Sequence, residues 1–358
     1  MKRLFLFLYF SLFFLADTYS QGCCSGGGNN PLTGSAPAGV LDEGMMDIAM
    51  SNVYSLSNRF FTGDVLTNPY FKDLKSNYLF LRTDYGLTKK LTFSAMTGYY
   101  TFRRITEFET GDENNSIESK GIGDLILLPR YQIYRKKKEK TTTEFDLGMG
   151  MKIPLGIEND STFVGYSYFL NTSGSVPFID SNEIWQTSPP LVQATTGSND
   201  FLASAFFMNT FHASKIDFFV SAVYTHRGWN SLGIKFGDQL AVGMFVGKTV
   251  LKGLYTLMQV RCEWTGKMQT HPGMDYLATY NIDVNSTGLK SVFCSPQISY
   301  SFPNKLRVFV FSDIPVYQYL NGTQASMPYN FTLGLNYRFS TVKNKVCEPE
   351  NTGKTEVK

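Results

Sequence analysis

Hydrophobic and polar residues alternate along most of this chain with a period of two. In the segment 329–340, every second position from Phe331 to Phe339 is apolar, and the positions from Asn330 to Arg338 between them are polar or glycine. Successive side chains of a strand point to opposite faces, so this pattern predicts strands with one apolar and one polar face. Twelve such segments are expected, at 45–58, 77–88, 91–105, 121–136, 141–155, 200–213, 215–229, 238–251, 253–267, 289–302, 305–319 and 329–340.

The predicted strands are long, and the links between them alternate in length. Strands of soluble proteins average about 5–6 residues, whereas a strand that spans a membrane needs about 9–11. Links such as 251–253 are short, whereas links such as 156–199 are long. Short turns at one end and long loops at the other are typical of outer-membrane barrels. We therefore expect an all-β fold, a transmembrane antiparallel up-and-down β-barrel of about twelve strands across residues 45–340. The segments 200–213 and 305–319 fit less well, because they are apolar on both faces.

The N-terminus predicts export from the cytoplasm. Lys2 and Arg3 precede an apolar run over residues 4–15, and small residues follow it. This combination indicates a secretory signal peptide over residues 1–20, cleaved before Gln21. The run is too short to span a bilayer as a helix.

Composition narrows the class of protein and its partners. Of the 358 residues, 15% are aromatic and 18% charged, and the net charge of +3 is too small to favour nucleic acid. Five cysteines are too few for a disulfide-stapled miniprotein. We expect an irregular periplasmic lead-in at 21–44 and a disordered periplasmic tail at 341–358. The expected location is the bacterial outer membrane, with membrane lipid, lipopolysaccharide and the barrel-assembly machinery as partners.

Charge differs between the two predicted ends of the barrel. The short links carry ten Lys or Arg residues, whereas the long link 156–199 has acidic residues and no Lys or Arg. We expect an acidic outer mouth and a basic inner rim, a field that would enrich cations at the mouth. The alternative is that these charges belong only to solvated loops.

Charged residues on the polar faces would point into the barrel lumen. The candidates for the lumen lining are Arg82, Asp84, Asp124, Arg130, Glu144, Asp146, Lys152, Asp217, Arg227, Arg261, Glu263, Arg307 and Arg338. Opposite charges are expected to pair, because an unpaired buried ion is costly. The lining is either a paired network that stiffens the barrel or a selectivity lining for a narrow pathway. Twelve strands lie between the small barrels that side chains fill and the large open porins, so we expect a restricted pore.

Four short runs resemble an outer-membrane family named for the MetA pathway of phenol degradation. The runs are Gly121-Ile122-Gly123-Asp124, Lys152-Ile153-Pro154-Leu155-Gly156, Thr196-Gly197-Ser198-Asn199-Asp200 and Leu333-Gly334-Leu335-Asn336-Tyr337-Arg338-Phe339. The resemblance covers roughly residues 121–340 and implies a barrel related to hydrophobic-compound transporters. Leu155 departs from the family pattern, which tends to Thr there, and the link 156–199 is long. The Cys-Cys-Ser-Gly-Gly run at 23–27 resembles barrels of the Bacteroidetes group.

Two other kinds of chemistry were considered. Outer-membrane lipolytic enzymes resemble one another in a His-x-Ser pair, in which His activates the Ser nucleophile. Here Gly228 follows His226 where that Ser should stand, and Ser231 lies too far along the chain. Cys23 and Cys24 could bind a soft metal, although a disulfide or a processing relic explains them as well. The sequence indicates no catalytic residues and no cofactor.

The resemblance therefore implies a channel or transporter for small, hydrophobic compounds. The alternative is a structural or assembly barrel with a plugged lumen, linked to metal handling through Cys23 and Cys24. A lipolytic enzyme ranks last. The identity of the solute does not follow from the sequence.

Overall fold

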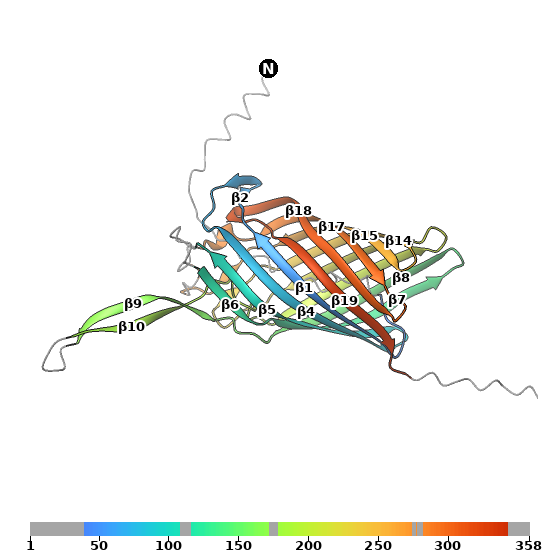
Figure 1. Cartoon of the computed structure of the whole chain (residues 1–358), viewed down its shortest axis with the longest axis horizontal. Helices are drawn as coiled ribbons and strands as arrows, with labels where there is room; N and C mark the ends of the chain where they lie inside the picture. Colours follow the sequence, from blue (N-terminus) through green and yellow to red (C-terminus); the bar gives the residue numbers. More distant parts are fainter. Residues whose placement is uncertain (1–38, 108–115, 172–177, 274–276, 278–281, 343–358) are drawn as a thin grey trace, which may run out of the picture.

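The computed structural model describes residues 39–107, 116–171, 178–273, 277 and 282–342. Within these residues, twelve antiparallel strands form a closed barrel (Figure 1). They are β1 (Met45–Ser57), β4 (Asp73–Thr88), β5 (Leu91–Thr106), β7 (Asp124–Lys137), β8 (Thr141–Pro154), β11 (Asp200–Phe211), β12 (Ile216–His226), β14 (Gln239–Leu251), β15 (Leu254–Thr265), β17 (Leu289–Ser301), β18 (Leu306–Ala325) and β19 (Tyr329–Ser340). Each strand pairs with the next in this order, and β19 pairs with β1 to close the ring. The predicted fold class is confirmed.

All twelve predicted segments are barrel strands, and the largest differences lie at the ends where the long links begin. The segment expected at 77–88 begins at Asp73, and the segment expected at 305–319 continues to Ala325. These extensions lie beyond the positions where one face must be apolar, so hydrophobic alternation does not mark them. The short turns define the periplasmic end in barrels of this kind, and the long links define the outer end.

The exterior of the barrel is apolar and the interior holds charge. On β8, Met149 is 77% exposed, whereas Lys152 is 2% exposed. This is the reverse of a soluble protein, in which lysine is almost never buried and large apolar side chains are. Other exposed apolar side chains on the barrel wall include Leu81, Phe201, Met244, Val246, Ile298, Leu333 and Leu335. An exterior of this kind is covered by lipid, and closed barrels with it are proteins of the bacterial outer membrane. Among the described residues, no helix has the length and apolar character to cross a bilayer.

The long links contain short elements of their own. These are β2 (Phe60–Gly63), β3 (Val65–Thr67), β6 (Ser116–Ile122), β9 (Ser161–Asn171), β10 (Phe178–Thr187), β13 (Ile234–Lys235), β16 (Gln269–Thr270) and the 3-10 helix η1 (Val284–Ser286). β9 and β10 pair only with each other, and Figure 1 shows their hairpin projecting from the outer end of the barrel. The long links are therefore partly regular structure.

The described end of the lead-in enters the periplasmic opening of the barrel. The backbone N–H of Leu41 donates to Thr92 Oγ1 at 2.7 Å, and both Val40 and Leu41 are buried. Gly86 permits this approach, because a Cβ there would lie 2.2 Å from the backbone oxygen of Asp42. The expected signal peptide, Cys23 and Cys24 lie outside the described residues, as does the tail from residue 343.

Candidate functional site

The link between β10 and β11 folds into the outer mouth of the barrel. We call residues 188–199 the mouth loop; it has no regular secondary structure, yet every residue from Ser188 to Thr195 is buried. Loops of ordinary proteins lie on the surface because their backbone polar groups need water. This burial therefore requires partners for both the apolar and the polar groups of the loop.

Apolar partners come from the other outer links. Leu191 is 3% exposed and Val192 is fully buried, and both belong to one apolar cluster with side chains from the strand ends and links around them. The other buried members of this mouth cluster are Phe60, Phe71, Ile105, Ile117, Ile234, Met268, Leu277, Ile282 and Ala325. The described outer links therefore share a small hydrophobic core that includes the tip of the mouth loop.

Gln193 satisfies the polar groups of the loop backbone. Its side-chain nitrogen donates to the backbone oxygens of Asp160 and Ser188, at 2.9 and 2.8 Å, and its side-chain oxygen accepts from the N–H of Asp160. Its own backbone oxygen accepts from Arg103 Nη1 at 2.9 Å. Below it, the hydroxyl of Thr195 donates to Asp124 Oδ1. The loop is thus held in a defined position.

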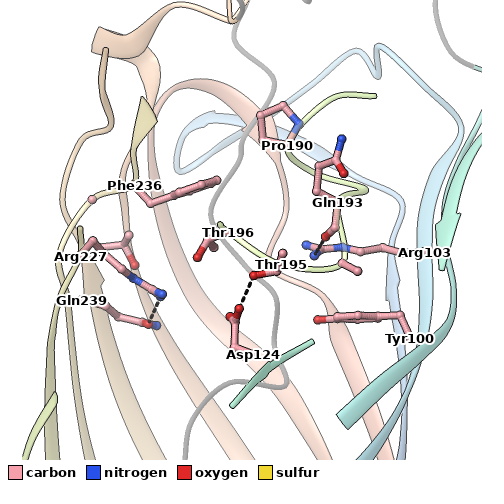
Figure 2. A pocket seen from close by; sticks show the side chains of 13 residues that line it. Tyr100, Arg103, Asp124, Pro190, Gln193, Thr195, Thr196, Arg227, Phe236 and Gln239 are labelled. Carbon is pink, nitrogen blue, oxygen red and sulfur yellow. Dashed lines mark hydrogen bonds between the residues drawn. The ribbon is translucent and has the colours of Figure 1, made fainter. Parts of the chain in front are cut away.

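A cavity of about 60 Å³ lies beneath the mouth loop (Figure 2). In the figure, Arg103 and Arg227 approach it from opposite sides, and Asp124 lies below. Its lining consists of Tyr100, Arg103, Asp124, Pro190, Gln193, Ala194, Thr195, Thr196, Arg227, Phe236, Gly237, Gln239 and Thr265. Strands from both sides of the barrel therefore meet the loop here.

A chain of ion pairs surrounds this cavity. Lys152 Nζ lies 3.1 Å from Asp124 Oδ2 and 3.0 Å from Asp200 Oδ2, and Arg227 Nη1 donates to Asp200 Oδ2 at 2.8 Å. Lys152 also donates to the hydroxyl of Thr196 in the mouth loop. Because Lys152, Asp124 and Asp200 are all buried, each charge depends on the others for its stability.

Asp238 holds the turn that follows Arg227. Its carboxylate accepts hydrogen bonds from the backbone N–H of Arg227, from Tyr224 and from His226. Partial burial acts to raise the pKa of Asp238. The hydrogen bonds and the neighbouring His226 lower the pKa by more than burial raises it, so it lies below its ordinary value. The turn is thereby fixed next to the cavity.

One side of the lumen is ionic. Asp84 of β4 lies 2.9 Å from Arg82 Nε and 3.1 Å from Arg130 Nη2, and all three side chains are buried. Asp47 of β1 pairs with Arg338 of β19 at 2.6 Å. We call the inward faces of the neighbouring strands β19, β1 and β4 the ionic wall.

The opposite side of the lumen carries clusters of apolar side chains. The strands β11, β12 and β14 are neighbours six places around the ring from β19, β1 and β4. Their inward side chains include Leu202, Phe206, Phe219, Val223 and Phe245, each no more than 6% exposed. Phe219 lies 6.1 Å from Phe206 and 6.4 Å from Phe245 between ring centroids. We call this the apolar wall.

The apolar wall corrects the expectation that one face of each strand is polar and points inward. The segment 200–213 is apolar on both faces because its outward residues meet lipid and its inward residues build this wall. The segment 305–319 follows the same rule, with Phe309 and Phe311 buried inside the barrel. The two segments that fitted the alternation least are therefore among those that carry apolar side chains into the lumen.

Two further ionic groups lie elsewhere in the lumen. Arg261 pairs with Glu263 at 2.7 Å and with Asp313 at 3.3 Å, and its guanidinium lies 4.7 Å from the ring of Phe293. At the periplasmic end, Glu144 accepts hydrogen bonds from the N–H of Val40 and from Gln132.

Nine of the ten principal lining candidates are buried inside the barrel: Arg82, Asp84, Asp124, Arg130, Glu144, Asp146, Lys152, Arg261 and Glu263. Arg338 is the exception, because its side chain is 44% exposed at the periplasmic end. Most of them form the ion pairs that the sequence predicts. Asp146 differs, since both of its carboxylate oxygens are buried and have no hydrogen-bond partner among the described residues. Their role in transport stays a prediction.

Sequence reasoning missed several residues of the site. Arg103, Asp47, Asp200 and Asp313 were not among the candidates. Asp200 stands at the end of the run Thr196–Asp200, which carries part of the family resemblance. The mouth loop also carries a signal, because residues 188–199 contain no charged residue although the links around them do.

The structure keeps the possible catalytic groups apart. His226 pairs with Asp238 at 2.9 Å, whereas the hydroxyl of Ser231 donates to Glu158 at 2.7 Å. No His–Ser pair therefore forms between these two residues. Within the part of the chain that the structure describes, no cluster of three or more His, Cys, Asp or Glu side chains is arranged to hold a metal.

Comparison with known proteins identifies the fold. No protein-family model matches the sequence, and no curated protein matches it. Among solved structures, the COG4313 outer membrane channel from Pseudomonas putida F1 is 13% identical and matches 84% of this chain and 97% of its own, at a TM-score of 0.57. A Pseudomonas aeruginosa FadL homologue is 9% identical, matching 83% and 90% of the two chains at 0.41. The first of these shares the fold of this chain.

Proposed function

We propose that this protein is an outer-membrane channel for small, hydrophobic compounds. The observation that supports it most is the apolar wall, because the inward face of an outer-membrane barrel is ordinarily polar. If the inward side chains served only to stiffen the barrel, pairs of opposite charges would be sufficient. The rings of the apolar wall are each no more than 6% exposed, so they would offer an apolar solute a favourable surface only after they move apart.

The mouth loop would act as the constriction of this channel. Its tip lies in the mouth cluster, and its other half contacts Asp124 and Lys152 of the barrel wall. The resemblance to the family of hydrophobic-compound transporters agrees with the proposal, and so does the fold shared with a channel. Passage would follow displacement of the loop, with the ion pairs around Asp200 left in place.

A second candidate is a plugged barrel that transports nothing. The buried tip of the mouth loop favours it, because the mouth cluster would then close the outer end. Under this candidate the barrel would serve a structural or assembly role.

Current measured across planar bilayers separates the two. We expect the purified wild-type protein to show small, intermittent openings. Leu191→Asp should raise the open fraction by roughly tenfold, because a charge inside the mouth cluster costs more than one kcal/mol and expels the loop. Ile184→Asp on the projecting hairpin is the matched control, since Ile184 is 43% exposed and lies outside the cluster. A wild-type protein that never opens, with openings only in Leu191→Asp, would establish the plugged barrel instead.

A further inference from the structure

The cavity beneath the mouth loop offers hydrogen-bond donors without matching acceptors. Arg227 Nε and Thr265 Oγ1 both lie in residues that line it, and both are buried with no hydrogen-bond partner in the described structure. Thr265 as a whole is 6% exposed. A buried donor without an acceptor costs about 1–3 kcal/mol, so such groups in a native protein call for an explanation.

Arg103 supplies a third donor and an uncompensated charge. Its guanidinium lies 5.2 Å from the ring centroid of Tyr100, and one of its nitrogens donates to the backbone oxygen of Gln193. No carboxylate of the described residues forms an ion pair with it, which distinguishes it from Arg227. Figure 2 shows Arg103 and Arg227 on opposite sides of the cavity, both directed towards its centre.

The acceptors near the cavity are already occupied. Asp124 accepts from Thr195 through one oxygen and from Lys152 through the other. Asp200 is shared between Lys152 and Arg227. Three cations, Arg103, Arg227 and Lys152, are thus grouped with Asp124 and Asp200, and a third carboxylate, Asp238, accepts from the backbone N–H of Arg227.

We propose that this cavity binds the anionic group of a small organic carboxylate, and the proposal rests on the channel function proposed above. The Nε–H of Arg227, the guanidinium of Arg103 and the hydroxyl of Thr265 belong to residues that line one cavity, and charge-assisted hydrogen bonds from arginine are the strong ones that a carboxylate accepts. The cavity has several times the volume that one water molecule occupies, so a carboxylate group can enter it. Tyr100 and Phe236 line the same cavity and provide apolar surface for the rest of the compound.

Among hydrophobic compounds, the proposed site favours those that carry a carboxylate group. A purely apolar hydrocarbon would leave the three donors unpaired while it passed. An aromatic or aliphatic acid would satisfy them at the mouth and then contact the apolar wall below.

Calorimetric titration of the full-length protein in detergent tests the subsite without requiring conduction. The probes are sodium benzoate, benzamide, which has a similar shape without the charge, and sodium chloride. We expect benzoate to bind at least about tenfold more tightly than benzamide, as charge-assisted hydrogen bonds require. Equal binding of the two would overturn the proposal. Chloride binding as tight as that of benzoate would assign the cavity to inorganic anions and contradict the organic carboxylate.

Substitutions locate the binding. Arg103→Gln should weaken benzoate binding by roughly tenfold, and Thr265→Val by a smaller factor, because only the first removes a charge. Arg104→Gln is the matched control; Arg104 is the next residue on the same strand, pairs with Glu118 outside the cavity and should leave binding unchanged. Equal losses in Arg103→Gln and Arg104→Gln would also overturn the proposal.

Conduction provides an independent arm. In a potassium chloride gradient, the reversal potential should favour the anion in the wild type and shift towards zero in Arg103→Gln. If the protein conducts without this preference and does not bind benzoate, the subsite is wrong and the channel stands. If benzoate binds but no current flows, the channel function fails and the subsite stands.

Discussion

The two walls of the lumen are built from sets of strands on opposite sides of the barrel, and they differ in how they become stable. The ionic wall buries Asp84 between Arg82 and Arg130, so each of its charges depends on its partners. The apolar wall buries rings such as Phe219 against one another, and no partner of opposite charge is needed. Together they show that one barrel can carry two kinds of inward face, because the inward face of each strand is free to differ when the outward face is fixed by lipid.

The ionic wall should be the more sensitive of the two to a single change. Asp84→Asn keeps the shape of the side chain but leaves two buried guanidinium groups without a counter-charge. We expect the free energy of unfolding, measured by urea titration in lipid vesicles, to fall by about 3–5 kcal/mol. Glu139→Gln in an exposed periplasmic turn is the control and should change it little. A loss below about 1 kcal/mol for Asp84→Asn would show that water, not Arg82 and Arg130, compensates Asp84.

The apolar wall should respond to loss of volume. Phe219→Ala removes a ring that contacts Phe206 and Phe245, and we expect a loss of about 3 kcal/mol in the same titration. Phe201→Ala, on the lipid-facing side of β11 where the side chain is 64% exposed, should cost clearly less. Equal losses at the two positions would mean that the inward rings are not packed against one another.

A lysine should destabilise the barrel on its lipid-facing side, although one is tolerated on the inward face. Met149→Lys places an ammonium group in lipid, three residues before the buried Lys152 on the same strand. Near the middle of the membrane, this substitution is expected to cost about 2 kcal/mol or more. Refolding yield into vesicles and urea titration both report it. An unchanged stability would place Met149 outside the lipid-covered band.

Most of the fold could be predicted from the sequence because lipid enforces one strict rule on the outward face. Alternation located all twelve strands, and the lining charges on the polar faces, such as Lys152 and Asp124, proved to be buried and paired. The mouth loop could not be predicted in this way. Its burial depends on Leu191 and Val192 meeting side chains far away in sequence, such as Phe60 and Met268, and no periodic pattern records such contacts.

The apolar wall could be predicted only in part. The segment 200–213 was recognised as apolar on both faces, but alternation alone cannot tell a lumen-facing ring from a poor strand. Arg103 was missed because it is distinguished by the absence of an ion pair with any carboxylate of the described residues, which depends on the folded arrangement. The sequence thus shows which strands are apolar on both faces, whereas the fold shows that their inward apolar side chains build the apolar wall.

The central claim is that the apolar wall is the route of an apolar solute, and single-channel recording with a neutral aromatic solute such as p-cresol tests it most directly. The account predicts transient blockades of the current whose duration falls by roughly tenfold in Phe219→Ser, a change of about 1.4 kcal/mol in binding. Ser51→Ala, a buried inward position of the ionic wall, should leave that duration unchanged. Blockades of equal duration in all three proteins, or none in the wild type, would contradict the account.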